Sequence, residues 1–207
     1  MNIISNPLIL DGRILTPELL VQTAKSNRPV ELSDEAWNQI SVSRSIVDNI
    51  VESGQVAYGV TTGVGSQKDF SVSSEAAAAY NLRLIKAHAT RVPGPVLNPE
   101  TVRGALIYMV NAFARGLSGV SKDLVQLILL KINTCDMPEI DASGSVGASD
   151  LVPLAQIAHW LLSSDEAKAN GLPRAKEALS LINSNAISLT FGAEQLVEAE
   201  RLLSAVD

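Results

Sequence analysis

An apolar repeat of about 3.6 residues, the period of an α-helix, recurs along most of this chain and constrains its fold most strongly. In the segment 33–54, the repeat places Trp37, Ile40 and Val47 on one side, between a Ser33 cap and Gly54. Apolar residues make up 46% of the chain but aromatic residues only 4%, so aliphatic side chains must fill the core. This composition is typical of packed helices.

The same pattern and similar cap residues predict further helices. They are expected at 17–25, 73–88, 99–115, 121–133, 151–162, 172–182 and 190–206. Short links that contain Gly or Pro separate several of them, which favours a bundle. A short extended segment is expected before Thr16. We therefore predict a mainly α, helical-bundle fold with Gly-rich loops, in which residues 1–207 form a single domain.

Charge and composition argue against several classes of partner. The net charge is −6, and the 16 Lys and Arg residues are scattered, so nucleic acid is not expected to bind. No apolar run approaches the roughly 20 residues of a membrane span. The single cysteine, Cys135, cannot form an internal disulfide, and residues 1–10 do not resemble a signal peptide. We expect a cytoplasmic protein, and no residue spacing predicts a metal site.

Two Gly-rich loops interrupt the helical pattern. The segment 58–65, Tyr-Gly-Val-Thr-Thr-Gly-Val-Gly, suits turns rather than a helix. The segment 144–149, Gly-Ser-Val-Gly-Ala-Ser, precedes a predicted helix start, where unpaired N–H groups favour negative charge. It lacks the lysine of a nucleotide-binding P-loop, and no strand is evident before it, so a nucleotide site is disfavoured.

These motifs resemble those of the aromatic amino-acid ammonia-lyases and aminomutases. Residues 144–154 are similar to the family's Gly-Ser-Val-Gly-Ala-Ser-Gly-Asp-Leu-Ala-Pro-Leu, and residues 58–65 to its Tyr-Gly-Val-Asn-Thr-Gly-Phe-Gly. Further similarities lie at residues 115–119 and 176–183. The resemblance covers nearly the whole chain. It implies the N-terminal, cofactor-bearing half of the ammonia-lyase fold, with the C-terminal half absent.

The resemblance also implies a reaction: non-oxidative elimination of ammonia, or aminomutase chemistry, on an aromatic or histidine-like α-amino acid. In the family, an Ala-Ser-Gly triplet cyclises to 4-methylideneimidazole-5-one (MIO), an electrophile that activates the substrate. Ala148, Ser149 and Asp150 stand at this catalytic position. By motif match, Tyr58 is the catalytic base for the β-proton.

Three further positions are matched to substrate binding by the same resemblance: Gly65, His88 and Asn183. Structural roles remain open beside these assignments. Tyr58 can be a packed phenol and Ser149 a helix N-cap, while His88 and Asn183 can each serve a helix C-terminus.

The triplet departs from the family's pattern, because Asp150 follows Ser149 directly and the expected Gly is missing. A Cβ at this position crowds a turn that normally requires glycine, which disfavours ring closure. Two alternatives therefore stay open. One is an MIO-independent relative that performs dehydration, isomerisation or Michael-type addition, and the other is a non-catalytic ligand-binding or scaffolding subunit.

The resemblance implies an assembly as well, because family members are much longer and complete their sites with later helices from neighbouring subunits. We expect a homo- or hetero-oligomer in which a separate chain supplies the C-terminal half, or else that the sequence is a piece of a longer protein. The expected substrate is a small molecule.

Overall fold

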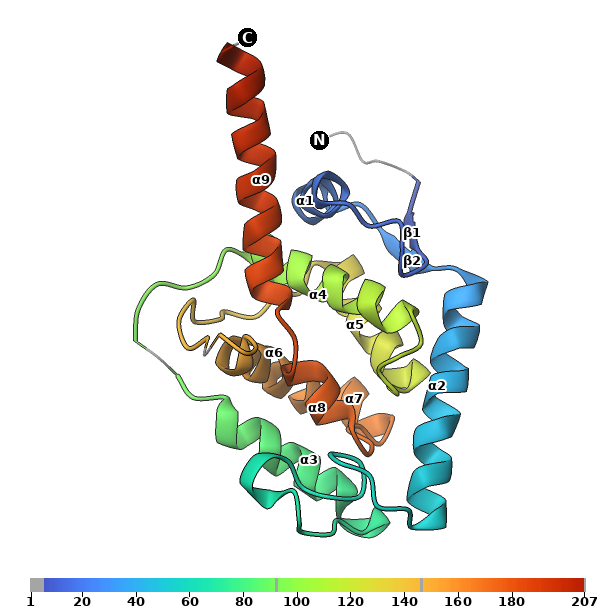
Figure 1. The fold of residues 1–207 in the computed structure, drawn as a ribbon. Helices are drawn as coiled ribbons and strands as arrows, with labels where there is room; N and C mark the ends of the chain where they lie inside the picture. Colours follow the sequence, from blue (N-terminus) through green and yellow to red (C-terminus); the bar gives the residue numbers. More distant parts are fainter. Residues whose placement is uncertain (1–5, 92, 146, 207) are drawn as a thin grey trace.

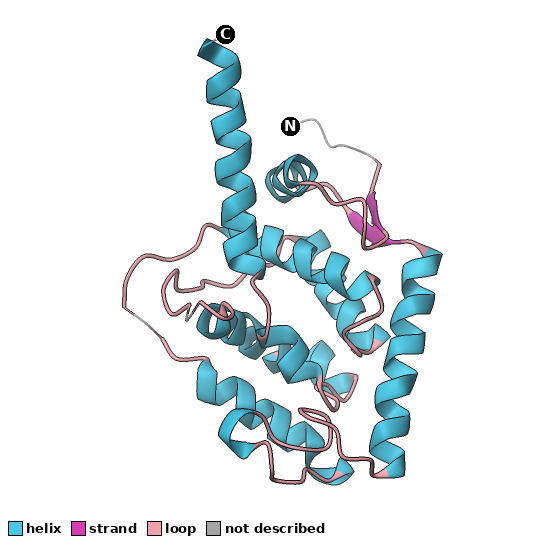
Figure 2. Cartoon of the chain, viewed as in Figure 1, coloured by secondary structure: helices cyan, strands magenta, loops and turns pink. Residues whose placement is uncertain are grey.

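The computed structural model describes residues 6–91, 93–145 and 147–206, and most of them are helical (Figures 1 and 2). The helices are α1 Pro17–Ser26, α2 Asp34–Ser53, α3 Ser74–His88, α4 Pro99–Ala114, α5 Lys122–Thr134, α6 Leu151–Ser163, α7 Asp165–Ala169, α8 Glu177–Ile182 and α9 Ala186–Val206, with a 3-10 turn, η1, at Gly65–Gln67. The strands are β1 Leu8–Leu10 and β2 Val30–Leu32. The predicted mainly α fold class is confirmed.

Several helices begin where the sequence predicts, because a hydroxyl caps a backbone N–H of the first turn. The side chains of Thr16, Ser33, Ser73 and Ser121 each accept such a bond. Asn98 occupies the cap position of α4 without a side-chain bond to the helix. At the other end of α2, Gly54 takes the left-handed conformation that stops the helix.

The core is built around α4, which packs against α1, α5 and α9 in the upper half of Figure 1. Residues from every side of α4 are buried, including Val102, Leu106 and Val110. Gly104 allows α9 to approach closely, since a Cβ there would lie 2.7 Å from the Thr190 side chain. Helix α4 is therefore the central helix of this half.

The two short strands lie beside this core and pair in parallel, with Leu8 opposite Val30 and Leu10 opposite Leu32. These four side chains are buried. The first strand agrees with the expected extended segment. The second was not predicted.

A buried cation, Arg103, joins three segments of this half. Its guanidinium donates to the carbonyl oxygens of Thr23 and Ala24 at the end of α1, of Arg28 before β2, and of Ile132 near the end of α5. Carbonyls in the last turn of a helix lack intrahelical partners, and a cation there is favoured by the helix dipole.

The lower half of Figure 1 is formed by α3, α6 and α8, and α3 packs against both of the others. A buried amide on α3, that of Asn81, joins two of these helices. It donates to Ala77 O and accepts a 2.9 Å hydrogen bond from the amide of Ala178 on α8. This half carries the two Gly-rich loops.

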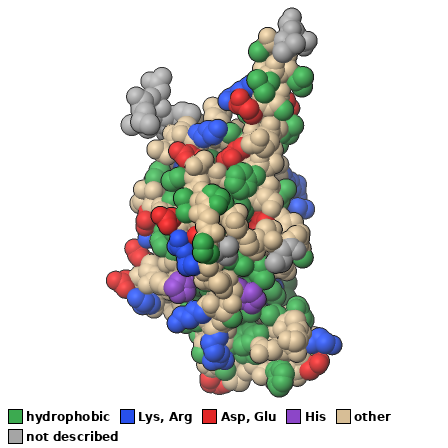
Figure 3. Space-filling view, turned by 90° about the vertical axis from the view of Figure 1, so that its left-hand side faces the viewer, with side chains coloured by type: hydrophobic (Ala, Val, Ile, Leu, Met, Phe, Trp, Pro, Cys, Tyr) green, Lys and Arg blue, Asp and Glu red, His purple; other side chains and the backbone are tan. Residues whose placement is uncertain are grey.

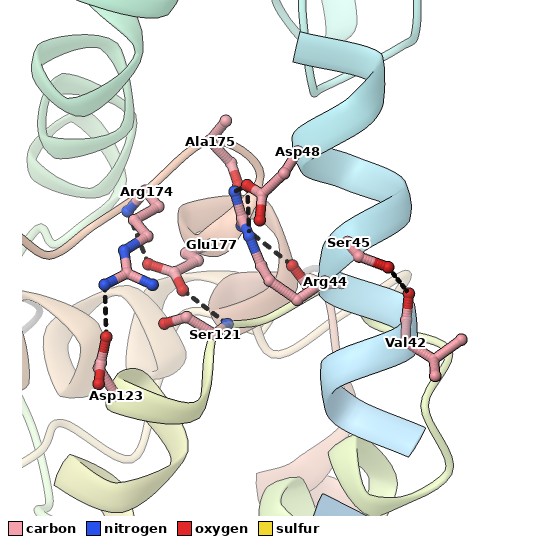
Figure 4. A network of polar contacts seen from close by, with 10 residues as sticks. Val42, Arg44, Ser45, Asp48, Ser121, Asp123, Arg174, Ala175 and Glu177 are labelled. Carbon is pink, nitrogen blue, oxygen red and sulfur yellow. Dashed lines mark hydrogen bonds and ion pairs between the residues drawn. The ribbon is translucent and has the colours of Figure 1, made fainter. Parts of the chain in front are cut away.

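A polar network fixes the segment before α8 against α2 and the start of α5 (Figure 4). Glu177, which is fully buried, accepts hydrogen bonds from the backbone amides of Ser121 at 2.9 Å and Arg174 at 2.6 Å. On α2, the Arg44 guanidinium donates to Ala175 O at 3.0 Å and pairs with Asp48. The start of α8 is thus held by its own buried carboxylate, and the segment before it by a guanidinium on α2.

Helix α9 packs on α1 and α4 at its beginning and then projects beyond them (Figure 1). Leu189, Leu196 and Leu203, spaced by seven residues, are exposed on it. Between its far end and α1 lies a groove of about 780 Å³, whose lining includes Lys25 and Arg201.

Two helix starts were predicted wrongly, and one helix was not predicted. The helix predicted at 172–182 begins only at Glu177, because Lys176 has a φ of 72°, which a right-handed helix cannot contain. Helix α7 was not predicted, and α9 begins four residues before position 190. Cys135, the C-cap residue of α5, is exposed and takes the left-handed conformation.

Candidate active site

The first Gly-rich loop is a series of turns that ends in η1. Gly59 has a φ of 67°, and a Cβ there would lie 2.5 Å from the side chain of Leu179 on α8. The adjacent Tyr58 is 58% exposed, and its hydroxyl oxygen accepts a 3.0 Å hydrogen bond from the amide of Gly65. The tight turn therefore bends the loop so that the phenol reaches its other end.

A second phenol holds the same end of the loop. Tyr80, on α3, accepts a 3.0 Å hydrogen bond from the amide of Val64. Two consecutive amides, those of Val64 and Gly65, are thus bound by phenol oxygens from different segments. The loop has a defined position over the face of α3.

A cavity of about 500 Å³ lies between this loop and α3. It is lined by Val64, Gly65, Ser66, Gln67, Tyr80, Arg83, Leu84, Ala87 and His88. Arg83 is permanently charged, and the described lining includes no carboxylate. The cavity therefore suits a small molecule that carries an anionic group.

His88 lies at the end of α3 and lines the same cavity. Its Nδ1 is 2.7 Å from the carbonyl oxygen of Leu84, and a carbonyl can only accept, so Nδ1 carries the proton in this hydrogen bond. In the neutral ring, Nε2 is then the acceptor nitrogen. The imidazole is held by its own helix and keeps one nitrogen for other contacts.

The second Gly-rich loop leads into α6. Gly144 has a φ of 101°, and a Cβ there would lie 2.7 Å from the Val152 side chain, so only glycine lets the loop fold against the first turn of α6. Ala148 is exposed, whereas Ser149 and Asp150 are 5% and 1% exposed. The third member of the loop motif, residue 146, lies outside the described residues.

Asp150, not Ser149, occupies the N-cap position of α6, so the alternative of Ser149 as a cap was wrong. The amide of Asp150 donates a 2.9 Å hydrogen bond to the carbonyl oxygen of Ser184. Its carboxylate accepts two hydrogen bonds from Ser188 on α9, from the amide at 2.8 Å and from the hydroxyl. Asp150 therefore ties the start of α6 to the start of α9.

Asn183 is the C-cap residue of α8 and is exposed. It immediately precedes Ser184, whose carbonyl oxygen accepts the hydrogen bond from the Asp150 amide. The residues selected from the sequence thus fall into two groups. Gly65 and His88 line the cavity on α3, and Tyr58 is bonded to Gly65. Asn183 adjoins the loop that ends at Asp150. Packing of α3 against α6 and α8 connects the two groups.

Residues 148–150 do not fit the MIO group, which forms in the family that the motifs resemble. Closure needs a flexible third residue whose amide nitrogen is free to approach the first residue's carbonyl carbon. Here the third residue is Asp150, its φ is −80°, and its N–H is bonded to Ser184 O.

Figure 3 views the molecule from the left-hand side of Figure 1 and shows histidine side chains together with several Lys and Arg side chains on this face.

Across the described ranges, no group of three or more His, Cys, Asp and Glu residues is arranged to hold a metal ion. Nor is any described helix long and apolar enough to cross a bilayer. The site offers basic groups and hydrogen-bond donors for a small ligand.

Sequence reasoning did not select three residues that the geometry brings forward. Tyr80 lines the same cavity on α3 as His88, and the helical spacing of the two residues was the signal that would have indicated it. Ser184 and Ser188 lie more than thirty residues beyond the loop that they hold, and no local pattern marks them.

Comparison with known proteins agrees with this arrangement. Residues 15–207 match the family model described as "Aromatic amino acid lyase", and the chain belongs to this family. The histidine ammonia-lyase of Caldanaerobacter subterraneus subsp. tengcongensis is 34% identical to it over 218 residues, which cover 97% of this chain and 43% of that relative. The resemblance noted from the motifs is thereby confirmed.

Two solved structures share the fold. One is ergothionase, the ergothioneine-degrading enzyme from Treponema denticola, with a TM-score of 0.85 and 28% identity over 95% of this chain and 43% of that chain. The other is phenylalanine aminomutase from Pantoea agglomerans, with a TM-score of 0.85 and 28% identity over 97% of this chain and 42% of that chain. The chain spans less than half the length of these three relatives.

Proposed function

We propose that this chain carries the base-bearing part of a lyase site that acts across the Cα–Cβ bond of a histidine-like α-amino acid. The observation that carries the proposal is the hydroxyl of Tyr58. It accepts a hydrogen bond from the amide of Gly65, and Gly65 lines the same cavity as Arg83 and His88. The reaction is the elimination of ammonia or a related amine, with Tyr58 as the base that removes the β-proton.

The hydrogen bond to Tyr58 supports this role. An amide N–H donated to a phenol oxygen stabilises negative charge on that oxygen when the proton has left. A general base must also reach the proton that it removes, and the 58% exposure of Tyr58 leaves its phenol open to a ligand. The buried alternative, a phenol packed in the core, is less consistent with this exposure.

The cavity supports an amino-acid substrate. Arg83 can bind a carboxylate through two parallel hydrogen bonds, which is the recognition that a guanidinium favours. His88 offers Nε2 to a polar group beside it. Relatives named histidine ammonia-lyase, ergothionase and phenylalanine aminomutase make a histidine-like or aromatic α-amino acid the substrate class to test.

The site requires a further polypeptide segment, because this chain covers only about two fifths of its relatives. The exposed leucines of α9, Leu189, Leu196 and Leu203, are the surface on which we expect that segment to pack. It is either a continuation of the chain or a separate subunit in a homo- or hetero-oligomer. Size-exclusion chromatography of the chain alone tests this part, and a stable monomer with full activity would contradict it.

Substitution of the two phenols tests the role of Tyr58. Both accept a backbone hydrogen bond in the same loop, so Tyr58→Phe and Tyr80→Phe remove equivalent contacts. In the assembly that the chain forms, formation of the unsaturated acid from L-histidine, ergothioneine and L-phenylalanine is followed by absorbance. We expect Tyr58→Phe to lower kcat about a hundredfold to ten-thousandfold. Tyr80 lines the cavity, so Tyr80→Phe should act mainly on substrate binding and raise KM more than it lowers kcat. Equal losses in the two variants would reject Tyr58 as the base.

A further inference from the structure

We propose that the backbone at Ala148, Ser149 and Asp150 remains an ordinary open peptide, and that the bonds of Asp150 to Ser184 and Ser188 keep it open. In this chain the aspartate joins the starts of α6 and α9 at the position where the family forms an electrophile. The inference concerns the covalent state of the chain and does not depend on the proposed function.

Ring closure follows a defined sequence of bond changes. The amide nitrogen of the third residue bonds to the carbonyl carbon of the first. That carbonyl oxygen leaves as water with the hydrogens of the second and third residues' amide nitrogens, and the carbon becomes doubly bonded to the nitrogen of the second residue. The serine side chain then loses its hydroxyl with the α-proton as a second water, which leaves an exocyclic double bond. Here the attacking atom would be the nitrogen of Asp150 and the target the carbonyl carbon of Ala148.

The first obstacle is the direction of the Asp150 amide. The amide donates its hydrogen to the carbonyl oxygen of Ser184, which lies in the segment between α8 and α9. The distance from the Asp150 nitrogen to this oxygen is 2.9 Å. To bring the nitrogen onto the Ala148 carbonyl carbon, the peptide unit must rotate and break this bond. Asp150 is 1% exposed, so water cannot readily replace the lost partner.

The second obstacle is the carboxylate. It is buried with the rest of Asp150 and accepts both donors of Ser188, the amide and the hydroxyl. Any shift of the Asp150 backbone draws the charged group away from these donors, and a buried carboxylate without donors is strongly disfavoured. In the family's motif an extra glycine separates the serine from the aspartate, so the attacking nitrogen and the anchored carboxylate belong to different residues.

Intact-mass spectrometry of the purified chain tests the proposal directly. We expect the mass of the unmodified sequence and no near-ultraviolet absorbance from a conjugated imidazolone. A mass lower by two water molecules would overturn the proposal. This measurement needs no substrate and no partner chain, so its result is separate from the outcome of the Tyr58→Phe experiment.

A variant with one glycine inserted between Ser149 and Asp150 tests the cause. The insertion restores Ala-Ser-Gly while Asp150 keeps its bonds to Ser184 and Ser188, so we expect its mass to fall by two waters. The same insertion combined with Ser149→Ala is the control, because without the serine hydroxyl the double bond cannot form. If the insertion variant shows native circular dichroism and still has the unmodified mass, the bonds of Asp150 are not what keeps the backbone open, and the proposed cause is wrong.

Discussion

The buried carboxylate of Glu177 accepts a 2.9 Å hydrogen bond from the amide of Ser121, which lies 56 residues earlier in the chain. Its second oxygen accepts a 2.6 Å hydrogen bond from the amide of Arg174. Replacement by glutamine turns one oxygen into a donor that faces another donor. We expect Glu177→Gln to lower the free energy of unfolding by about 1–3 kcal/mol.

Urea denaturation measures this change, and Glu198→Gln is the matched control. Glu198 lies on α9 with its side chain 60% exposed and contacts Arg201 at 3.7 Å, so its loss should change stability by less than about 1 kcal/mol. Equal destabilisation by the two variants would mean that the buried network around Glu177 does not hold the start of α8.

The bond between Ser188 and Asp150 gives a second stability prediction. Ser188→Ala removes the hydroxyl that donates to the buried carboxylate and leaves only the amide donor. We expect a loss of about 1–3 kcal/mol in the free energy of unfolding. On the same helix, Ser204 donates to the Glu200 carbonyl at an exposed position, so Ser204→Ala should change stability little. A neutral Ser188→Ala variant would show that this bond does not anchor the loop.

Binding at the cavity on α3 gives a third prediction. If Arg83 holds the substrate carboxylate, Arg83→Gln should weaken binding of L-histidine about tenfold or more, because hydrogen bonds to charged groups contribute about 1.5–3 kcal/mol. Histamine, which lacks the carboxylate, should bind the variant and the parent alike. Lys86→Gln is the control, since Lys86 is on α3 but outside the cavity lining. Calorimetry that finds equal L-histidine affinity in all three proteins would exclude this role of Arg83.

The fourth prediction concerns alkaline pH. Burial, and then the positive charge of Arg44, lower the pKa of Lys176 below its ordinary value of 10.5. Between the lowered pKa and 10.5, the unfolded chain binds more protons than the folded chain, so this group makes stability rise with pH. Below that window, Lys176 is protonated in both states and its contribution is constant.

Lys176→Met removes this dependence. The free energy of unfolding of the parent protein, relative to that of the variant, should therefore increase as pH rises through the window. Urea denaturation of both proteins from neutral to alkaline pH gives the difference directly. A difference that is constant or falls with pH would contradict the lowered pKa of Lys176.

Local chemistry explains which parts of the fold were predictable. Ser33 and Gly54 fix the ends of α2 through bonds within a few residues, so the sequence locates them. The strand Val30–Leu32 depends on pairing with Leu8–Leu10, and its own three residues carry too little periodicity to indicate it. The shortened start of α8 depends on Lys176, whose backbone is left-handed and whose Nζ donates to Ser118 O and Ser180 Oγ.

The candidate site was predictable to a similar extent. Motif similarity located Tyr58, His88 and the loop before α6, because short ordered patterns carry that information. It did not indicate that the amide and carboxylate of Asp150 are held by residues beyond α8. Such contacts between distant segments arise only when the helices pack.

The side chain of Arg103 is hydrogen-bonded to α1, to the segment before β2 and to α5, and it therefore couples the local unfolding of these segments. No one of these segments can detach without leaving a charged group unsolvated, so their amides should exchange with deuterium in a single cooperative event. The β1–α1–β2 unit, although short, then unfolds together with the main core and does not fray separately.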